Sequence, residues 1–305
     1  MFWYITKPVS DASQKRPLFS RGQPMFHFAV ASIAMVLLVG AGAFAADKTV
    51  DDLLKETSEL AQKGKLTDAL ASATQAVQLD AKDPRPLLAR GKVQEALDNQ
   101  RAAATDFTKV IELDPKNAEA YDHRGDVHFR LGKFTESVGD FDKSFELKDN
   151  PKQYWKRGIS NYYAGKYEAG EKDFDAGKTI WADDVENAAW WYLCAAKLRG
   201  ADKARADILK IGNDKRVPLM VVYDLYRGKA KPEDVLKAVD EGKPAKDELN
   251  SRLFYAHLYL GLWYESQGDK KKTLEHITKA AEDFDQKGYM WDVARVHRDK
   301  LRNEK

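Results

Sequence analysis

The chain contains a single cysteine among its 305 residues, so no disulfide can form within it. This residue, Cys194, lies in the apolar run WWYLCAAKL, which favours a small buried side chain over a reactive thiol. Segments of alternating apolar and polar residues, the pattern of half-buried β-strands, are also missing. The missing alternation argues against a sheet, and the helical periodicity described below indicates an all-α protein.

The motifs of common enzyme classes are missing too. Gly177-Lys178-Thr179 is similar to the end of a phosphate-binding loop, but Lys172 stands where that loop needs its first glycine. There is no nucleophile elbow and no H-E-x-x-H sequence. His257 and His276 fall on paired predicted helices, yet no third ligand accompanies them, which favours solvated or hydrogen-bonded histidines over a metal pair. We therefore expect no catalytic site, no metal and no cofactor.

A strong excess of one charge is absent. The formal net charge is +2, and the first 45 residues contain four basic residues and one acidic residue. Without them the net charge would be about −1. Binding of nucleic acid needs a basic face for the phosphates. The sequence therefore predicts no nucleic-acid partner.

Long apolar runs are confined to the N-terminus. Basic residues precede an apolar run from Phe26 to Val39, and Ala43-Phe44-Ala45 has the A-x-A pattern of a cleavage site. We expect residues 1–45 to be a signal peptide cleaved near Ala45/Ala46, which would make the protein periplasmic or secreted. The alternative is an uncleaved membrane anchor formed by residues 26–46. No cysteine follows the run closely, so a lipid-attachment site is missing.

What the chain does contain is a pattern with a period of about 34 residues. Its clearest copy, from Ala118 to Asn150, predicts two amphipathic helices joined by a tight turn. A glycine in the first helix and a phenylalanine in the second characterise this copy and its neighbours. These pairs are Gly91 and Phe107, Gly125 and Phe141, and Gly158 and Phe174. Two looser copies also occur. One begins at Val50, and the other lies near the C-terminus at Phe254.

This pattern resembles the tetratricopeptide repeat superfamily over roughly two thirds of the chain. The resemblance implies a right-handed superhelical solenoid of helix-turn-helix units with a helical C-terminal segment and a capping helix, about a dozen helices in all. We expect four repeats in residues 46–184, an irregular helical segment in 185–252, and a final repeat with the capping helix in 253–305.

In such repeats the first helices line a concave face that meets partners. Spacing places two sets of residues there, the first mostly charged and the second mostly aromatic. They are Asp122, Asp126, Phe129 and Arg130 in the third repeat, and Trp155, Ile159 and Tyr162 in the fourth. Aromatic residues beside an arginine are common anchors for peptides. The alternative is that Trp155 and Tyr162 only pack against the neighbouring repeat.

An arginine and an aspartate occur together in the middle repeats. The arginine precedes the first-helix glycine, and the aspartate precedes the second-helix phenylalanine. The residues are Arg90 and Asp106, Arg124 and Asp140, and Arg157 and Asp173. Because both types are missing together from the first and last repeats, we predict three structural ion pairs within repeats. A register shifted by one repeat, with Asp106 facing Arg124, is the competing arrangement.

The order of segments after Trp190 resembles that of NlpI-type cell-envelope repeat proteins, although this chain lacks their lipid-anchored cysteine. The resemblance implies a homodimeric periplasmic adaptor that binds proteins or extended peptides, with an envelope protease or a murein hydrolase as partner. The alternative function is a binding module for a small molecule or glycan at Trp190, Trp191 and Tyr192. A closed pocket of about 300 Å³ or more at these aromatic residues would favour that alternative.

Overall fold

The computed structural model describes residues 48–284 and 286–303, and these form 15 α-helices, one short 3-10 helix and no strand. The predicted signal peptide lies outside the described residues. The first eight helices are α1 (Val50–Gln62), α2 (Leu66–Leu79), α3 (Pro84–Ala96), α4 (Gln100–Leu113), α5 (Ala118–Arg130), α6 (Phe134–Leu147), α7 (Tyr154–Tyr163) and α8 (Tyr167–Gly177), with η1 (Pro151–Gln153) before α7. The remaining helices are α9 (Val185–Arg199), α10 (Ala201–Asp207), α11 (Leu219–Tyr226), α12 (Pro232–Ala238), α13 (Lys246–Ser266), α14 (Lys270–Glu282) and α15 (Tyr289–Asn303).

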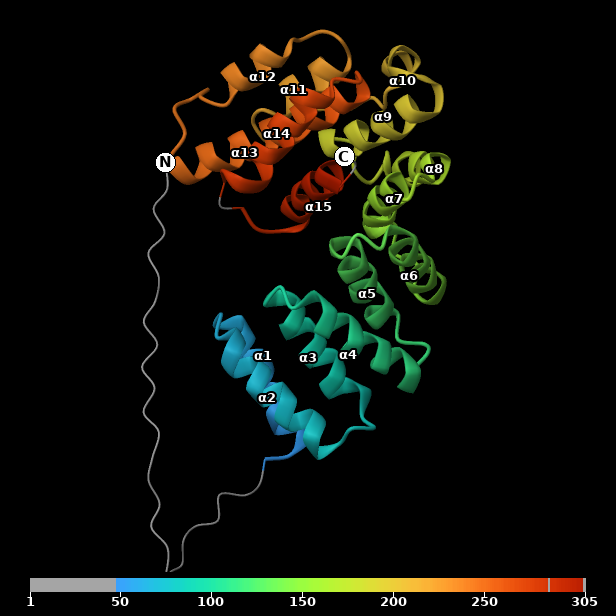
Figure 1. Cartoon of the computed structure of the whole chain (residues 1–305), viewed down its shortest axis with the longest axis vertical. Helices are drawn as coiled ribbons and strands as arrows, with labels where there is room; N and C mark the ends of the chain where they lie inside the picture. Colours follow the sequence, from blue (N-terminus) through green and yellow to red (C-terminus); the bar gives the residue numbers. More distant parts are fainter. Residues whose placement is uncertain (1–47, 285, 304–305) are drawn as a thin grey trace, which may run out of the picture. The chain divides into compact units, whose positions relative to one another are not determined.

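The first four repeats are the helix pairs α1 with α2, α3 with α4, α5 with α6, and α7 with α8, and they follow one another in Figure 1. Local chemistry sets where the first helices begin. Thr49 forms a capping box with Asp52, Asp83 caps α3 with Pro84 at its first position, and Asn117 accepts from Ala120 N. The all-α repeat architecture predicted from the sequence is confirmed.

A glycine in each of the first helices α3, α5 and α7 lets the second helix approach closely. A Cβ atom added at Gly91 would lie 2.7 Å from the Phe107 ring, and one at Gly125 would lie 3.0 Å from Phe141. A Cβ atom added at Gly158 would likewise lie 2.7 Å from the Phe174 ring. All three phenylalanines are buried. The recurring glycine and phenylalanine are therefore one packing unit of the repeat.

The core is unevenly distributed along the chain. Small apolar clusters lie between repeats 2 and 3, such as the one formed by Ala103, Phe107 and Val127. One large cluster joins the third and fourth repeats to α9 and the C-terminal helices. The described residues 48–284 and 286–303 form one compact unit, and the predicted segment boundary at residue 252 falls inside α13.

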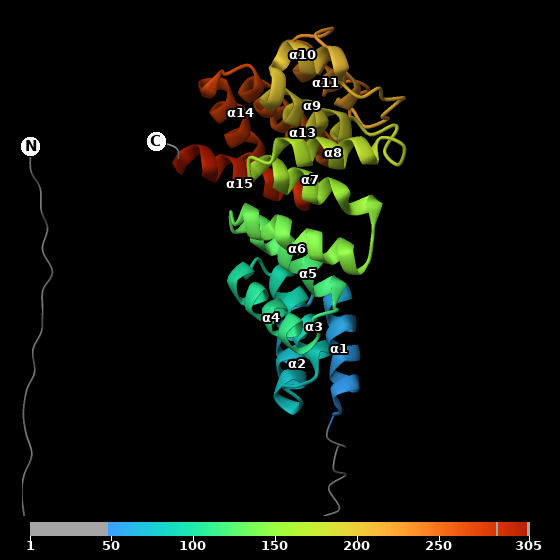
Figure 2. The same cartoon turned by 90° about the vertical axis from the view of Figure 1, so that its right-hand side faces the viewer.

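The C-terminal helix returns to the middle of the chain. Helix α15 packs on α14, as expected for a capping helix, and it also contacts α5. Figures 1 and 2 both show α15 beside α7. Over residues 48–284 and 286–303, we find no helix with the length and apolar character needed to cross a membrane.

A tertiary contact follows the end of α10. This helix ends at Asp207. The hydroxyl of Tyr223 donates to Leu209 O over 2.9 Å and accepts from Ile211 N over 3.3 Å. This tertiary contact takes up backbone groups of Leu209 and Ile211 that a longer helix would use.

Candidate functional site

The first helices α1, α3 and α5 are neighbours, and their shared side is the candidate binding surface, called here the first-helix face. Equivalent positions in successive repeats hold Leu54, Leu88, Asp122 and Trp155. Towards the C-terminal end this face is covered by α13 and α15, whereas at α1 and α3 it carries exposed residues such as Arg85 and Lys92. The face therefore has a covered end and an open end.

Aromatic contacts with α15 close the covered end. Phe129 is fully buried, and its ring stacks on that of Tyr289 with centroids 5.4 Å apart. Trp155 meets the same Tyr289 ring edge-on at 4.8 Å. Ile159 is 1% exposed. Tyr162 is 4% exposed, and its hydroxyl donates to Glu265 of α13 over 2.8 Å.

The expectation of an open partner groove is therefore wrong at Phe129, Ile159 and Tyr162. The apolar side chains on this part of the face are buried by the chain's own C-terminal helices instead of a partner. Changing Trp155 and Tyr162 to alanine is expected to destabilise the fold, because Tyr162 is buried and truncating a buried aromatic typically costs about 3–5 kcal/mol.

The charged residues predicted on the third repeat form internal networks. Arg130 donates to Glu95 of α3 over 2.6 Å and to Asp292 of α15 over 2.8 Å. Lys156 lies 2.8 Å from Asp126 and 3.4 Å from Asp122. Burial raises the pKa of Asp126 even though Lys156 opposes the shift. These residues hold α3, α5, α7 and α15 together.

The open end carries solvent-exposed ion pairs between neighbouring first helices. Arg85 of α3 pairs with Asp51 of α1 at 2.9 Å, and Lys92 pairs with Glu119 of α5 at 2.8 Å. The side chains of these four residues are 46% to 77% exposed. Half-buried Leu54 and Leu88 lie on the same helices.

Between the two ends, His123 of α5 lies 2.8 Å from Glu95 and 3.7 Å from Glu119. Burial by itself would lower the pKa of His123. The two carboxylates outweigh this effect and raise the pKa to about 9, so the ring is cationic at neutral pH. Sequence spacing within one repeat did not identify the cluster of His123 with Glu95 and Glu119, because Glu95 belongs to the preceding repeat.

The arginine and aspartate of each middle repeat face each other as the co-occurrence pattern predicts. Each guanidinium donates two hydrogen bonds to the aspartate of its own repeat, in the bidentate geometry that orients both groups. The shorter bonds are 2.7 Å for Arg90 and Asp106, 2.6 Å for Arg124 and Asp140, and 2.5 Å for Arg157 and Asp173. Each arginine therefore pairs with the aspartate of its own repeat, and the shifted arrangement with Asp106 facing Arg124 does not occur.

The first and last repeats use other pairs at the same positions. In repeat 1, Ser72 donates to Glu56 over 3.0 Å. In the last repeat, His276 stands at the aspartate position and its Nδ1 lies 2.9 Å from Nδ1 of His257. Burial lowers the pKa of His257 to about 4, with a smaller effect of His276, so this pair is neutral near pH 7. Among the described residues no cluster of three metal-ligating side chains occurs.

The aromatic residues proposed for a small ligand belong to the core. Trp191 and Tyr192 are 6% and 0% exposed, and Cys194 beside them is fully buried. Burial raises the pKa of the Cys194 thiol, which keeps it protonated. Trp190 lines a cavity of about 220 Å³, smaller than the pocket expected for a free small molecule.

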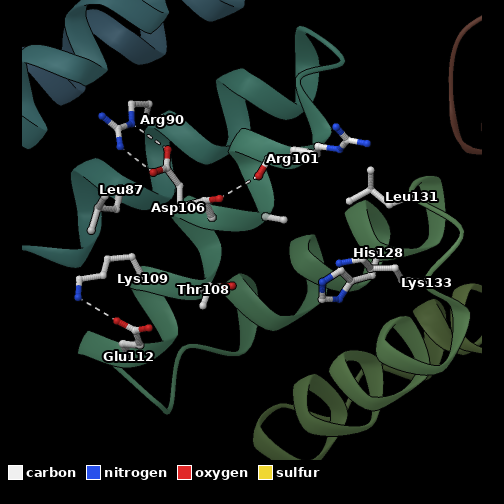
Figure 3. A pocket seen from close by; sticks show the side chains of 12 residues that line it. Leu87, Arg90, Arg101, Asp106, Thr108, Lys109, Glu112, His128, Leu131 and Lys133 are labelled. Atoms are coloured by element: carbon white, nitrogen blue, oxygen red, sulfur yellow. Dashed lines mark hydrogen bonds and ion pairs between the residues drawn. The ribbon is translucent and has the colours of Figure 1, made fainter.

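A larger recess of about 670 Å³ lies between α4 and the end of α5 (Figure 3). Arg90 and Lys109 in its wall are already paired with Asp106 and Glu112. Its other cations, Arg101 and Lys133, are exposed surface side chains. We assign no ligand to this recess.

A family model described as "Tetratricopeptide repeat" matches residues 84–117, the second repeat. The protein SGT1 homolog of Bos taurus is 30% identical over 102 residues, which cover 33% of this chain and 30% of that protein. The mitochondrial import receptor subunit TOM70 of Homo sapiens is 32% identical over 62 residues, 20% of this chain and 10% of that protein. The matches thus span less than a third of the length of these relatives.

A tetratricopeptide repeat protein from Parabacteroides merdae ATCC 43184 has a similar crystal structure. It superposes with a TM-score of 0.50 at 18% identity, covering 85% of this chain and 86% of that one. Helix pairs, the 34-residue match and this shared fold define the class: the chain is an all-α helical repeat protein. Within that class, residues 84–117 match the tetratricopeptide repeat family, and the chain shares its fold with a solved tetratricopeptide repeat protein.

Proposed function

We propose that the protein is a non-enzymatic scaffold that binds partner proteins or extended peptides on the open end of its first-helix face. One observation supports this most strongly. The chain covers the apolar end of the face with α15 and leaves α1 and α3 exposed, with half-buried Leu54 and Leu88 beside exposed ion pairs. Exposed ion pairs are worth only about 0–1 kcal/mol, so a partner can replace them at low cost.

A matched pair of charge reversals in the second repeat tests this proposal. Lys92 on α3 and Lys109 on α4 both pair with a glutamate, and their side chains are 46% and 53% exposed. We expect Lys92→Glu to reduce capture of partners from an envelope extract several-fold and Lys109→Glu to leave capture unchanged. Circular dichroism should show both variants folded. Equal capture by both variants would contradict the proposal.

We further propose that the protein is exported and acts in the cell envelope as a homodimeric adaptor in protein processing or cell-wall maintenance. The A-x-A pattern at Ala43–Ala45 and the resemblance to NlpI-type proteins support this location and an envelope protease or murein hydrolase as partner. N-terminal sequencing of the native protein is expected to begin at Ala46. An intact leader would instead favour the membrane anchor formed by residues 26–46.

A further inference from the structure

A small cavity lined by aromatic rings lies where α7, α8, α9 and α15 meet. Its volume is about 220 Å³. The apolar lining consists of Trp155, Ile159, Phe174, Trp181, Trp190 and Met290. The rings of Phe174 and Trp190 are stacked, with centroids 6.5 Å apart and an interplanar angle of 19°. Since pockets for small molecules usually measure about 300–1,000 Å³, this cavity matches a single side chain better than a free ligand.

The polar lining of the cavity is acidic. Asp184, Glu186 and Asn187 complete the lining, and no lysine or arginine takes part. Asp184 accepts from Arg216 over 2.7 Å and from Glu186 N over 2.9 Å, in both cases through Oδ1. Its Oδ2 therefore remains available, and the side chain is 29% exposed. Both oxygens of Glu186 are already engaged, by Arg216 and Tyr259.

A second recess adjoins the cavity and shares Trp181 and Asp184 with it. This recess measures about 620 Å³ and extends along residues 179–184 and 213–216. Its acidic residues are Asp183, Asp184 and Asp214, and its basic residues are Lys215 and Arg216. An extended chain in this recess can therefore direct one side chain into the cavity.

We propose that this cavity receives the side chain of a lysine or arginine from an extended segment of a partner. The cationic group meets Asp184 Oδ2, and the apolar stem lies against Trp155 and Trp190. Aromatic faces attract such cations, most strongly when the cation is desolvated. This inference rests on the proposed scaffold function and specifies the chemistry of the partner.

Four short peptides test the inference on the full mature protein. The probes are Ac-Ala-Xaa-Ala-NH₂ with arginine, lysine, norleucine or glutamate as Xaa, added at millimolar concentration. We expect the arginine and lysine peptides to shift the indole N–H signals of Trp155, Trp181 and Trp190 in NMR spectra. Their affinity should exceed that of the norleucine peptide about ten-fold and fall as salt is added. Equal binding of norleucine, preference for glutamate, or no shift overturns the proposal.

Three variants locate the binding. Asp184→Asn should weaken the arginine peptide about ten-fold, whereas Glu168→Gln, a matched charge loss on exposed α8, should have no effect. Asp184 also caps α9. Met290→Lys therefore serves as a second variant, because its ammonium group places a competing cation in the cavity and should abolish peptide binding. Unchanged binding in Met290→Lys overturns the assignment. If Lys92→Glu impairs partner capture while the peptides fail to bind, only the cavity proposal fails.

Discussion

Arg130 of α5 and Asp292 of α15 form an ion pair across 162 residues of sequence, with Nε donating to Oδ2 over 2.8 Å. The same guanidinium reaches Glu95 of α3 through Nη1 over 2.6 Å. Arg130 thus connects two neighbouring repeats to the C-terminal helix. This contact marks the boundary between the covered and open ends of the first-helix face.

Asp292→Asn should loosen the attachment of α15. The side chains of Arg130 and Asp292 are 16% and 12% exposed, so the change leaves a largely buried cation with one carboxylate fewer. Breaking a fully buried pair costs about 3–5 kcal/mol, and we expect a smaller loss here because Glu95 still pairs with Arg130. Hydrogen exchange should become faster in α15. Asp299→Asn, on the same helix with a 57% exposed side chain, should show little change.

Arg124 and Asp140 should be energetically coupled. Their side chains are 18% and 7% exposed. Each single change to alanine strands a charge, so the double change should cost less than the sum of the singles, with a coupling of about 1–3 kcal/mol in urea unfolding. Asp140 also pairs with His128 at 2.8 Å, which adds to the cost of removing it.

The exposed pair of Lys109 and Glu112 provides the control cycle, with side chains 53% and 58% exposed. Its coupling should not exceed about 1 kcal/mol. Strict additivity for Arg124 and Asp140 would show that their pair contributes no stability.

Two glycines of the third repeat should respond to alanine in opposite directions. A Cβ at Gly125 would lie 3.0 Å from the Phe141 ring, so Gly125→Ala should destabilise the protein by about 1–3 kcal/mol through overpacking. A Cβ at Gly139 in α6 meets nothing within 4 Å. Gly139→Ala should therefore stabilise the helix by about 0.5–1 kcal/mol. Thermal unfolding of both variants measures the difference, and a loss of equal size in both would refute the close helix contact.

His123 should make the protein less stable as the pH rises above neutrality. Its pKa is about 9 in the folded chain, above the ordinary value of about 6.5. The folded state therefore holds a proton that the unfolded state loses between about pH 6.5 and 9. The stabilisation is complete below about pH 6.5 and disappears as the pH approaches 9.

Urea unfolding of wild type and His123→Gln at pH 6 and pH 9 tests this. The variant should be less stable at pH 6, and the difference should shrink at pH 9. A difference that stays constant across this range would mean that the charge of His123 contributes nothing.

The sequence by itself determined the repeat period, the helix pairs and the ion pairs within repeats. These features depend on residues at most a few turns apart, such as Gly125 with Phe141 or Arg90 with Asp106, so periodicity and co-occurrence are enough to recognise them. The end of α10 could not be predicted in this way, because Tyr223 of another helix takes up its backbone groups.

Only the tertiary structure decided which part of the first-helix face is open. Phe129 and Trp155 are aromatic residues of the kind that often anchor peptides. The same residue types are equally suited to burial under α15, where both rings contact Tyr289. Apolar burial is not directional, so a sequence pattern does not reveal whether a partner or the chain itself supplies the covering surface. The aromatic cavity beside Asp184 likewise arises from four helices that meet only in the folded chain.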